Sequence, residues 1–146
     1  MDDLDIKIIS MLQDDARASN AGIAWDVGVS EGTVRRRLRR LIQDEFISFS
    51  ALRNPGKMGY ASEALVGVQA DPDKIDKVAE DLAQLNEVDW VTITTGAYDI
   101  FAWVAVQSGE ALGIFLRTKV GTIPGVRRME TFVNLSVKKR GYGISV

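Results

Sequence analysis

The sequence predicts an α+β protein with two domains: a three-helix, winged-helix-like helix-turn-helix domain, then a ferredoxin-like βαββαβ sandwich. The first observation is a pair of helical patterns that flank a glycine-containing turn at residues 28–30. The second is a cluster of five arginines within residues 33–40. The third is a second half in which strand-like and helix-like patterns alternate in the order βαββαβ. We therefore predict a first domain at 1–53, a hinge at 54–60 and a second domain at 61–146.

The turn at residues 28–30 separates two amphipathic helices. Apolar residues recur at helical spacing on both sides of it, namely Ile23, Ala24 and Val27 before the turn and Val34, Leu38, Leu41 and Ile42 after it. Gly28 can end the first helix because it enters the left-handed conformation at little cost. Ser30 is placed to cap the second helix, and Glu31 suits its positive end.

The second helix of this unit is strongly basic. Its helical phase points Arg36 and Arg40 away from the apolar face with Arg39 beside them, while Arg35 and Arg37 flank the core. Guanidinium groups bind guanine or phosphate oxygens bidentately, so this face suits a DNA major groove. The alternative is a solvated basic face. The candidate DNA-binding residues are Ser30, Thr33, Arg35, Arg36, Arg39 and Arg40.

Composition excludes several classes of site. The 146 residues include neither cysteine nor histidine, which argues against disulfides, His/Cys metal sites and triads that use either residue. No apolar stretch reaches the ~18–20 residues of a membrane span, and the acidic start is unlike a signal peptide, so we expect a cytoplasmic protein. The net charge of −2 does not oppose DNA binding, because the arginines form a local patch.

The rest of the first domain follows from similar patterns. Apolar spacing predicts a first helix over residues 3–14, capped by Asp2 or Asp3. Ser19 or Asn20 opens the next helix. Residues 46–53 are rich in β-formers and predict a strand or short wing. Clustered turn residues at 54–59 mark the domain hinge.

The second half predicts one sheet with two helices on one face. The predicted elements are strands at 63–70, 88–95, 100–107 and 127–138, helices that begin near 71 and 108, a turn at 96–99 and a loop at 121–125. The strand at 100–106 is apolar on both faces, which is typical of a strand buried on both sides. We expect a second copy of the sheet to cover the open face. Whichever of Phe101 and Trp103 points away from the helices should then lie between subunits.

Five stretches in this order resemble the Lrp/AsnC family, the leucine-responsive or feast/famine transcriptional regulators. They are residues 4–17, 29–41, 95–99, 123–126 and 130–132, and the resemblance covers essentially the whole chain. It implies an N-terminal domain that binds double-stranded DNA, and the two-fold symmetry expected of a dimer predicts a palindromic operator. It also implies a homodimer that assembles into a higher oligomer, with an octamer among the candidates, and often an amino acid bound between dimers. Trp25 departs from the polar residue expected there, and we favour local packing over a contact at the phosphate edge.

The turn at 95–99 is the candidate effector site. Gly96 permits close approach of a ligand, Tyr98 offers a ring and a hydroxyl, and Asp99 can accept from an ammonium group. The alternative is a plain β-turn in which Asp99 accepts from turn amides. The resemblance implies that further loops converge on this turn and add the hydroxyl groups of threonines. The full candidate set is Thr95, Gly96, Ala97, Tyr98, Asp99, Thr122 and Thr131.

Two other classes of protein compete with a DNA-binding regulator. Siroheme decarboxylases share the two-domain outline, but we expect histidines at their haem site and this chain has none. A ligand sensor that does not touch DNA is disfavoured by the five clustered arginines. We therefore predict a regulator rather than an enzyme, with neither cofactor nor metal.

Overall fold

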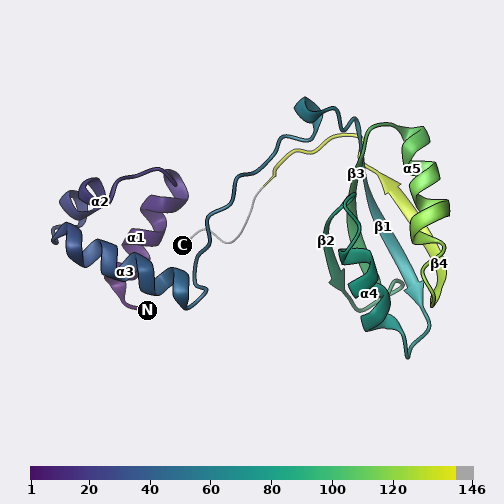
Figure 1. The fold of residues 1–146 in the computed structure, drawn as a ribbon, viewed down its shortest axis with the longest axis horizontal. Coiled ribbons are helices and arrows are strands. Elements are labelled where there is room, and N and C mark those ends of the chain that lie inside the picture. Colours follow the sequence, from purple (N-terminus) through teal and green to yellow (C-terminus); the bar gives the residue numbers. More distant parts are fainter. Residues whose placement is uncertain (141–146) are drawn as a thin grey trace. The chain divides into compact units, whose positions relative to one another are not determined.

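The computed structural model describes residues 1–140, and residues 141–146 of the predicted second domain lie outside the described part. The chain divides into two compact units (Figure 1). The first comprises Met1–Leu52 together with Arg140, and the second comprises Arg53–Lys139.

The first unit is a bundle of three helices, α1 (Asp3–Asp14), α2 (Asn20–Val27) and α3 (Glu31–Gln43). Its core is the predicted set of apolar side chains, centred on Ile8, Ile23, Val34 and Leu41, all of them fully buried. Ile42 was predicted in this core, but its side chain is exposed. Val34, Leu38 and Leu41 already fill the packed side of α3, and Ile42 lies about 100° further around the helix.

Local capping fixes where these helices begin and end. Asp2 caps α1 in a reciprocal capping box with Asp5, and Ser19 caps α2. Gly28 ends α2 in the left-handed conformation at φ 74°, as predicted. Ser30 caps α3 by accepting a hydrogen bond from the backbone N–H of Thr33. The turn between α2 and α3 is therefore encoded by adjacent residues.

The predicted strand or wing at 46–53 is wrong. This segment has no strand, and its Phe46, Phe49 and Leu52 are exposed. A β-forming sequence needs a neighbouring strand to supply hydrogen bonds, and no described residue pairs with this one. A short 3₁₀ turn, Gly56–Met58, follows within the predicted hinge.

The second unit is an antiparallel sheet with two helices on one face. Its elements are β1 (Ser62–Ala70), α4 (Ile75–Ala83), β2 (Val88–Ile93), β3 (Ile100–Val106), α5 (Gly109–Phe115), a π-helical turn (Leu116–Val120) and β4 (Val126–Val133). The strand order β2-β3-β1-β4 is that of the predicted ferredoxin-like sandwich. Ala64, Val66 and Val68 of β1 pack with Val78 and Leu82 of α4 in its core.

The largest differences between predicted and observed bounds in this unit are at the start of α4 and the end of β4. Helix α4 begins at Ile75 rather than near residue 71, because residues 72–74 form a turn closed by a hydrogen bond from Lys74 N–H to the Asp71 carbonyl. Strand β4 ends at Val133 rather than 138, and Leu135 is 97% exposed. Val133 pairs with Ala64 near the start of β1, so little of β1 remains for a longer β4 to pair with.

The sheet face opposite the helices carries aromatic side chains. Phe101 and Trp103 both lie on it, because residues two apart on a strand share a face, while Ile100, Ala102 and Val104 point into the core. The expectation that only one of the two aromatics faces away from the helices is therefore wrong. Trp90, Leu65 and Phe132 pair with Trp103 or with its neighbours across the sheet, which extends the apolar face over four strands.

Candidate DNA interface and effector pocket

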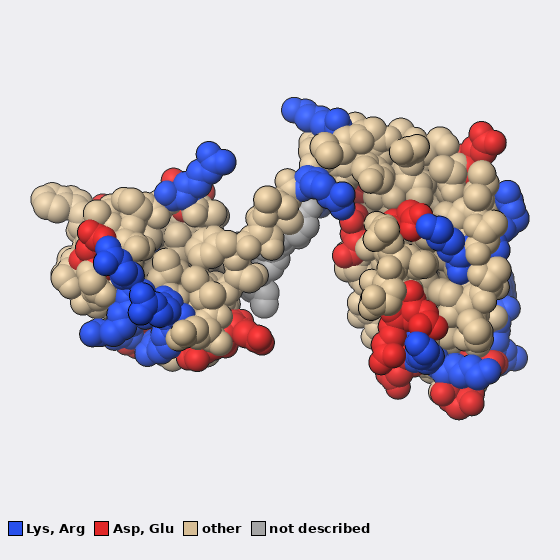
Figure 2. Space-filling view, viewed as in Figure 1, with Lys and Arg blue, Asp and Glu red and all other residues tan. Residues whose placement is uncertain are grey.

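Most of the basic residues of the first unit lie on α3, where Figure 2 shows a dense blue patch. Arg35, Arg36, Arg39 and Arg40 are all exposed on this helix. Arg35 forms an ion pair with Glu31 one turn earlier. Within residues 1–140, Arg36 and Arg39 form no ion pair, so their guanidinium groups are available to a ligand.

Arg40 does not point freely outward as the helical phase predicts. Its guanidinium group lies 2.5 Å from Asp5 Oδ2 on α1, and Arg37 lies 3.3 Å from Asp5 Oδ1. Arg37, which flanks the core as predicted, also contacts Asp2 at 2.5 Å. Two of the five arginines are therefore engaged by acids of α1.

These contacts also perturb ionisation at the start of α1. The pKa of Asp2 is lowered to about 2, first by the backbone N–H of Asp5 and then by the Arg37 guanidinium group. The same pairing with Asp2 raises the pKa of Arg37 above its ordinary value. The ion pair between Asp2 and Arg37 is thus fully formed at neutral pH.

Ser30 and Thr33 lie at the amino end of α3, next to the basic face. Their hydroxyl groups are 2.9 Å apart, and Ser30 Oγ also accepts from the Thr33 N–H. Ser30 is exposed and Thr33 is half-buried. A helix amino end with hydroxyl groups and a positive dipole is a favourable place for a phosphate oxygen.

Trp25 was expected to pack locally, but its side chain is 87% exposed on α2. The small core of this unit is complete without it, since Ile23 and Ala24 supply the buried face of α2. Local packing therefore does not account for a tryptophan at this position.

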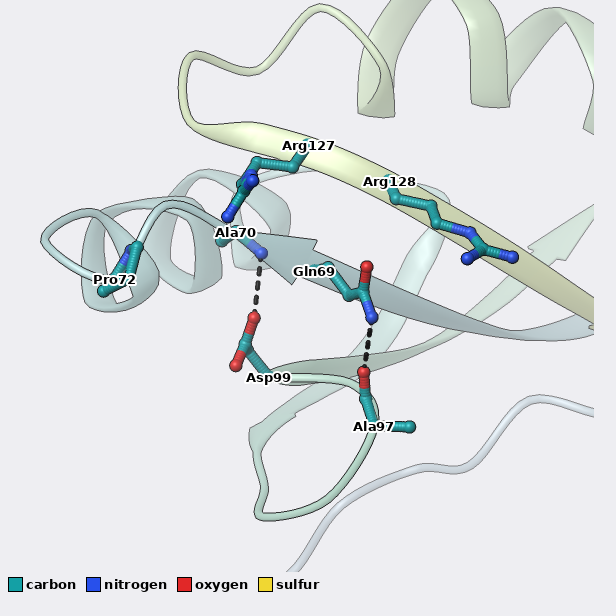
Figure 3. A pocket seen from close by; sticks show the side chains of 7 residues that line it. All are labelled: Gln69, Ala70, Pro72, Ala97, Asp99, Arg127 and Arg128. Atoms are coloured by element: carbon teal, nitrogen blue, oxygen red, sulfur yellow. Dashed lines mark hydrogen bonds between the residues drawn. The ribbon is translucent and has the colours of Figure 1, made fainter.

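A pocket of about 460 Å³ opens at the ends of β1 and β4 in the second unit (Figure 3). It is lined by Gln69, Ala70, Pro72, Ala97, Asp99, Arg127 and Arg128. Asp99 Oδ2 accepts from the Ala70 N–H at 2.9 Å, and the side-chain amide of Gln69 donates to the Ala97 carbonyl at 2.7 Å. These two bonds join the 95–99 loop to β1.

The pocket contains only part of the predicted effector set. Ala97 and Asp99 line it, and Thr95 and Gly96 lie exposed in the same loop. The Tyr98 ring packs instead against Phe101 and Phe132, on the open face of the sheet. Thr131 pairs with core-facing Val66, and the Thr122 hydroxyl donates to the Thr118 and Lys119 carbonyls. The structure does not bring these last three to the pocket.

Sequence reasoning missed Arg127, Arg128, Gln69 and Pro72. The two arginines follow the loop at 121–125, in which only Thr122 is a predicted site residue, and they fall at the start of the predicted strand at 127–138. A pair of consecutive basic residues at the start of a strand, opposite an acid-bearing turn, is the pattern that could have indicated them.

Two family models together match most of the chain. The AsnC-type helix-turn-helix domain matches residues 1–42, and the Lrp/AsnC ligand binding domain matches residues 63–144. The chain belongs to the Lrp/AsnC family. The first match covers the three helices, and the second covers the sheet and its pocket.

Comparisons with individual proteins agree with this assignment. An uncharacterized HTH-type transcriptional regulator of Pyrococcus furiosus is 46% identical over 143 residues, with 97% of both chains covered. An HTH-type transcriptional regulator of Methanocaldococcus jannaschii is 33% identical over 142 residues, covering 97% of this chain and 96% of that one. The structure of Escherichia coli AsnC superposes with a TM-score of 0.91 at 28% identity, covering 100% of this chain and 99% of that one.

The predicted family, fold class and regulatory function are thereby confirmed. The protein is a DNA-binding transcriptional regulator of the Lrp/AsnC type, and the siroheme-decarboxylase-like alternative is not favoured. Within residues 1–140, no helix is long and apolar enough to cross a membrane.

Proposed function

We propose that this regulator reads a palindromic DNA operator as a homodimer, with α3 in the major groove, and that an amino acid bound in the second unit adjusts its affinity. The observation that carries the proposal is the exposed basic face of α3. Arg36 and Arg39 lie on it without an ion pair among the described residues, while Val34 and Leu41 lock the opposite face into the core.

The proposed roles follow from the chemistry of each side chain. Arg36 and Arg39 are three residues apart on one side of α3, so both can reach base edges in one groove. Ser30 and Thr33 would bind a phosphate at the amino end of α3, which fixes the register of the helix on the duplex. Arg35, held by Glu31, would contact the backbone beside the groove.

Fluorescence anisotropy on a duplex from the upstream region of the protein's own gene tests the DNA contacts. A bidentate contact between arginine and guanine supplies ~1–3 kcal/mol of discrimination, so R36A together with R39A should weaken specific binding by about 10²-fold or more. The matched control is R117A, which removes an exposed positive charge from the second unit. Tight, sequence-selective binding by the double variant would contradict the assignment of the recognition face.

The apolar sheet face supports the proposed dimer. Trp90 and Phe132 are about half exposed on it, and Phe101 and Trp103 lie between them. A continuous aromatic surface of this kind is stabilised when a second protein surface covers it. A second copy of the sheet has the same shape and polarity, so a two-fold dimer is the simplest cover.

The pocket supports an amino-acid effector. Asp99 uses Oδ2 for the Ala70 N–H, and no described residue hydrogen-bonds to its Oδ1, which could accept from an α-ammonium group. Arg127 and Arg128 would bind the carboxylate through their guanidinium N–H groups. Binding of a charged molecule here would couple the 95–99 loop to β1 and β4.

Calorimetric titration with the twenty amino acids tests the effector. The variant D99N keeps an oxygen for the Ala70 N–H and removes the negative charge, so it should fold and bind at least tenfold more weakly. The control T131V changes a predicted residue that lies outside the pocket and should bind like the wild type. Equal binding by D99N and the wild type would contradict this site, and no binding by the wild type would contradict an amino-acid effector.

A further inference from the structure

The carboxylate of Asp5 is buried at the junction of α1 and α3. Among the described residues it is the only charged side chain that is buried, with 0% exposed. Its Oδ2 accepts from the Asp2 N–H at 3.0 Å and from Arg40 at 2.5 Å, and both of its oxygens lie 3.3–3.4 Å from Arg37. The helix that bears the DNA-binding arginines is therefore tied to α1 through a charged group.

Stability alone does not account for a charged residue here. A buried ion pair is often no more stabilising than well-packed apolar side chains of similar volume. Asp5 lies three and four residues before Ile8 and Ile9, which belong to the aliphatic core of this unit, so it is on the same side of α1 as that core. The carboxylate does have an effect that no apolar residue could have, because it fixes the direction of two guanidinium groups.

Those two guanidinium groups remain in reach of solvent. The side chain of Arg40 is 47% exposed and that of Arg37 is 23% exposed, although both contact a carboxylate that is completely buried. Arg40 is also four residues from Arg36, so the two lie side by side on α3. A guanidinium group that already contacts a carboxylate, and that is still partly exposed to solvent, loses little conformational entropy when it binds DNA.

We propose that Asp5 is a positioning residue for DNA recognition: its buried carboxylate orients Arg40 towards one operator contact and withholds part of the charge of α3 from non-specific phosphates. This inference rests on the proposed function of α3. Arg36 and Arg39 supply mobile contacts in this scheme, while Arg40 supplies a fixed one. Asp5 acts only through the arginines and does not itself touch DNA.

The scheme makes specific and non-specific binding respond in opposite directions. In D5N, Arg40 loses its charged anchor, so affinity for the operator should fall about tenfold. The uncompensated charge on α3 should raise affinity for unrelated duplex DNA, and the salt dependence of that binding should steepen by about one unit in the logarithmic slope. A purely structural defect would lower both affinities together and leave the slope unchanged.

A double-variant cycle shows whether Asp5 acts through Arg40. R40Q should also lower operator affinity about tenfold, and D5N combined with R40Q should be no weaker than R40Q alone. The proposal would be overturned if the losses of operator affinity in D5N and R40Q multiplied in the double variant. It would also be overturned if D5N had the same ratio of specific to non-specific affinity as the wild type. If circular dichroism shows that D5N does not fold, the variant R37Q replaces it, because R37Q leaves Asp5 paired with Arg40. We expect R37Q to keep operator affinity within threefold of the wild type. A tenfold loss would overturn the proposal.

The wild type separates this proposal from the proposed function. If wild-type protein binds no duplex selectively, the assignment of α3 as the recognition helix fails. If it binds selectively and D5N has the same selectivity, only the role of Asp5 fails.

Discussion

Five arginines within one stretch of eight residues differ in what their guanidinium groups contact. Helical phase predicts the direction in which each side chain leaves α3, and it correctly places Arg36 and Arg39 on the exposed side. It cannot predict that Arg40 turns towards Asp5, because that acid lies 35 residues earlier in the chain. The partner of a long, flexible side chain is set by tertiary packing, which a single helix does not encode.

The same limit applies to the pocket. Ala97 and Asp99 of the motif at 95–99 both line the pocket, but a motif contains only residues that are close in sequence. Gln69 and the two arginines join the pocket because antiparallel pairing brings the ends of β1 and β4 beside that loop.

At the residue scale, the low pKa of Asp2 predicts a pH-dependent stability. Asp2 has a folded-state pKa of about 2 against an ordinary value of 3.8, so its contribution is fully present above about pH 4 and is lost as the pH falls towards 2. The variant D2N keeps a capping oxygen and removes the charge. The melting temperature of the wild type should exceed that of D2N above pH 4, and the difference should shrink towards pH 2. A difference that stays constant over this range would contradict the role given to the Asp2 charge.

At the scale of elements, the interiors of helices and strands were easier to predict than their ends. Capping residues next to a helix can be recognised in the sequence: Gly28 ends α2, and Ser30 begins α3. The end of β4 and the missing strand at 46–53 depend on whether a neighbouring strand exists. Alternating sequence beyond Val133 therefore could not show where the strand stops.

A close approach within the sheet gives an element-scale prediction. Gly67 lies directly beneath the Tyr98 ring, and a Cβ atom at this position would lie 2.8 Å from Tyr98 Cγ. The variant G67A should therefore displace Tyr98 and lower the free energy of unfolding by ~1–3 kcal/mol, as overpacking does. Chemical denaturation measures this loss.

A second substitution shows whether the clash is the cause. The new methyl group meets the Tyr98 ring and also Phe101 Cε1, which would lie 3.0 Å away. Combining G67A with Y98A removes the nearer ring, so the G67A effect should become smaller when it is measured against Y98A alone. An equal loss in both backgrounds would mean that Gly67 is required for another reason.

At the scale of the whole molecule, the apolar sheet face predicts the oligomeric state. Burying an aromatic side chain contributes ~1.5–3 kcal/mol, and a two-fold interface counts each residue twice. Because Phe101 and Trp103 share the open face, F101K and W103K should each weaken the particle and leave the core intact. Light scattering should give at least a dimer for the wild type and smaller particles for both variants.

The control for this prediction is I114K on α5, an exposed position on the helix side of the unit. It should remain at least dimeric. A wild-type monomer at micromolar concentration with a folded spectrum would contradict the covered sheet face.

The central claim is that two copies of α3 read DNA together. In vitro selection from a library of random duplexes, with the wild-type protein as the binder, tests it most directly because no operator sequence need be known. A two-fold dimer with α3 in the major groove should enrich a palindrome whose half-sites lie about one helical turn apart, or a multiple of it. The library should lose this motif when the R36A and R39A substitutions are combined. Enrichment of no motif by the wild type, or of the same motif by the double variant, would contradict the claim.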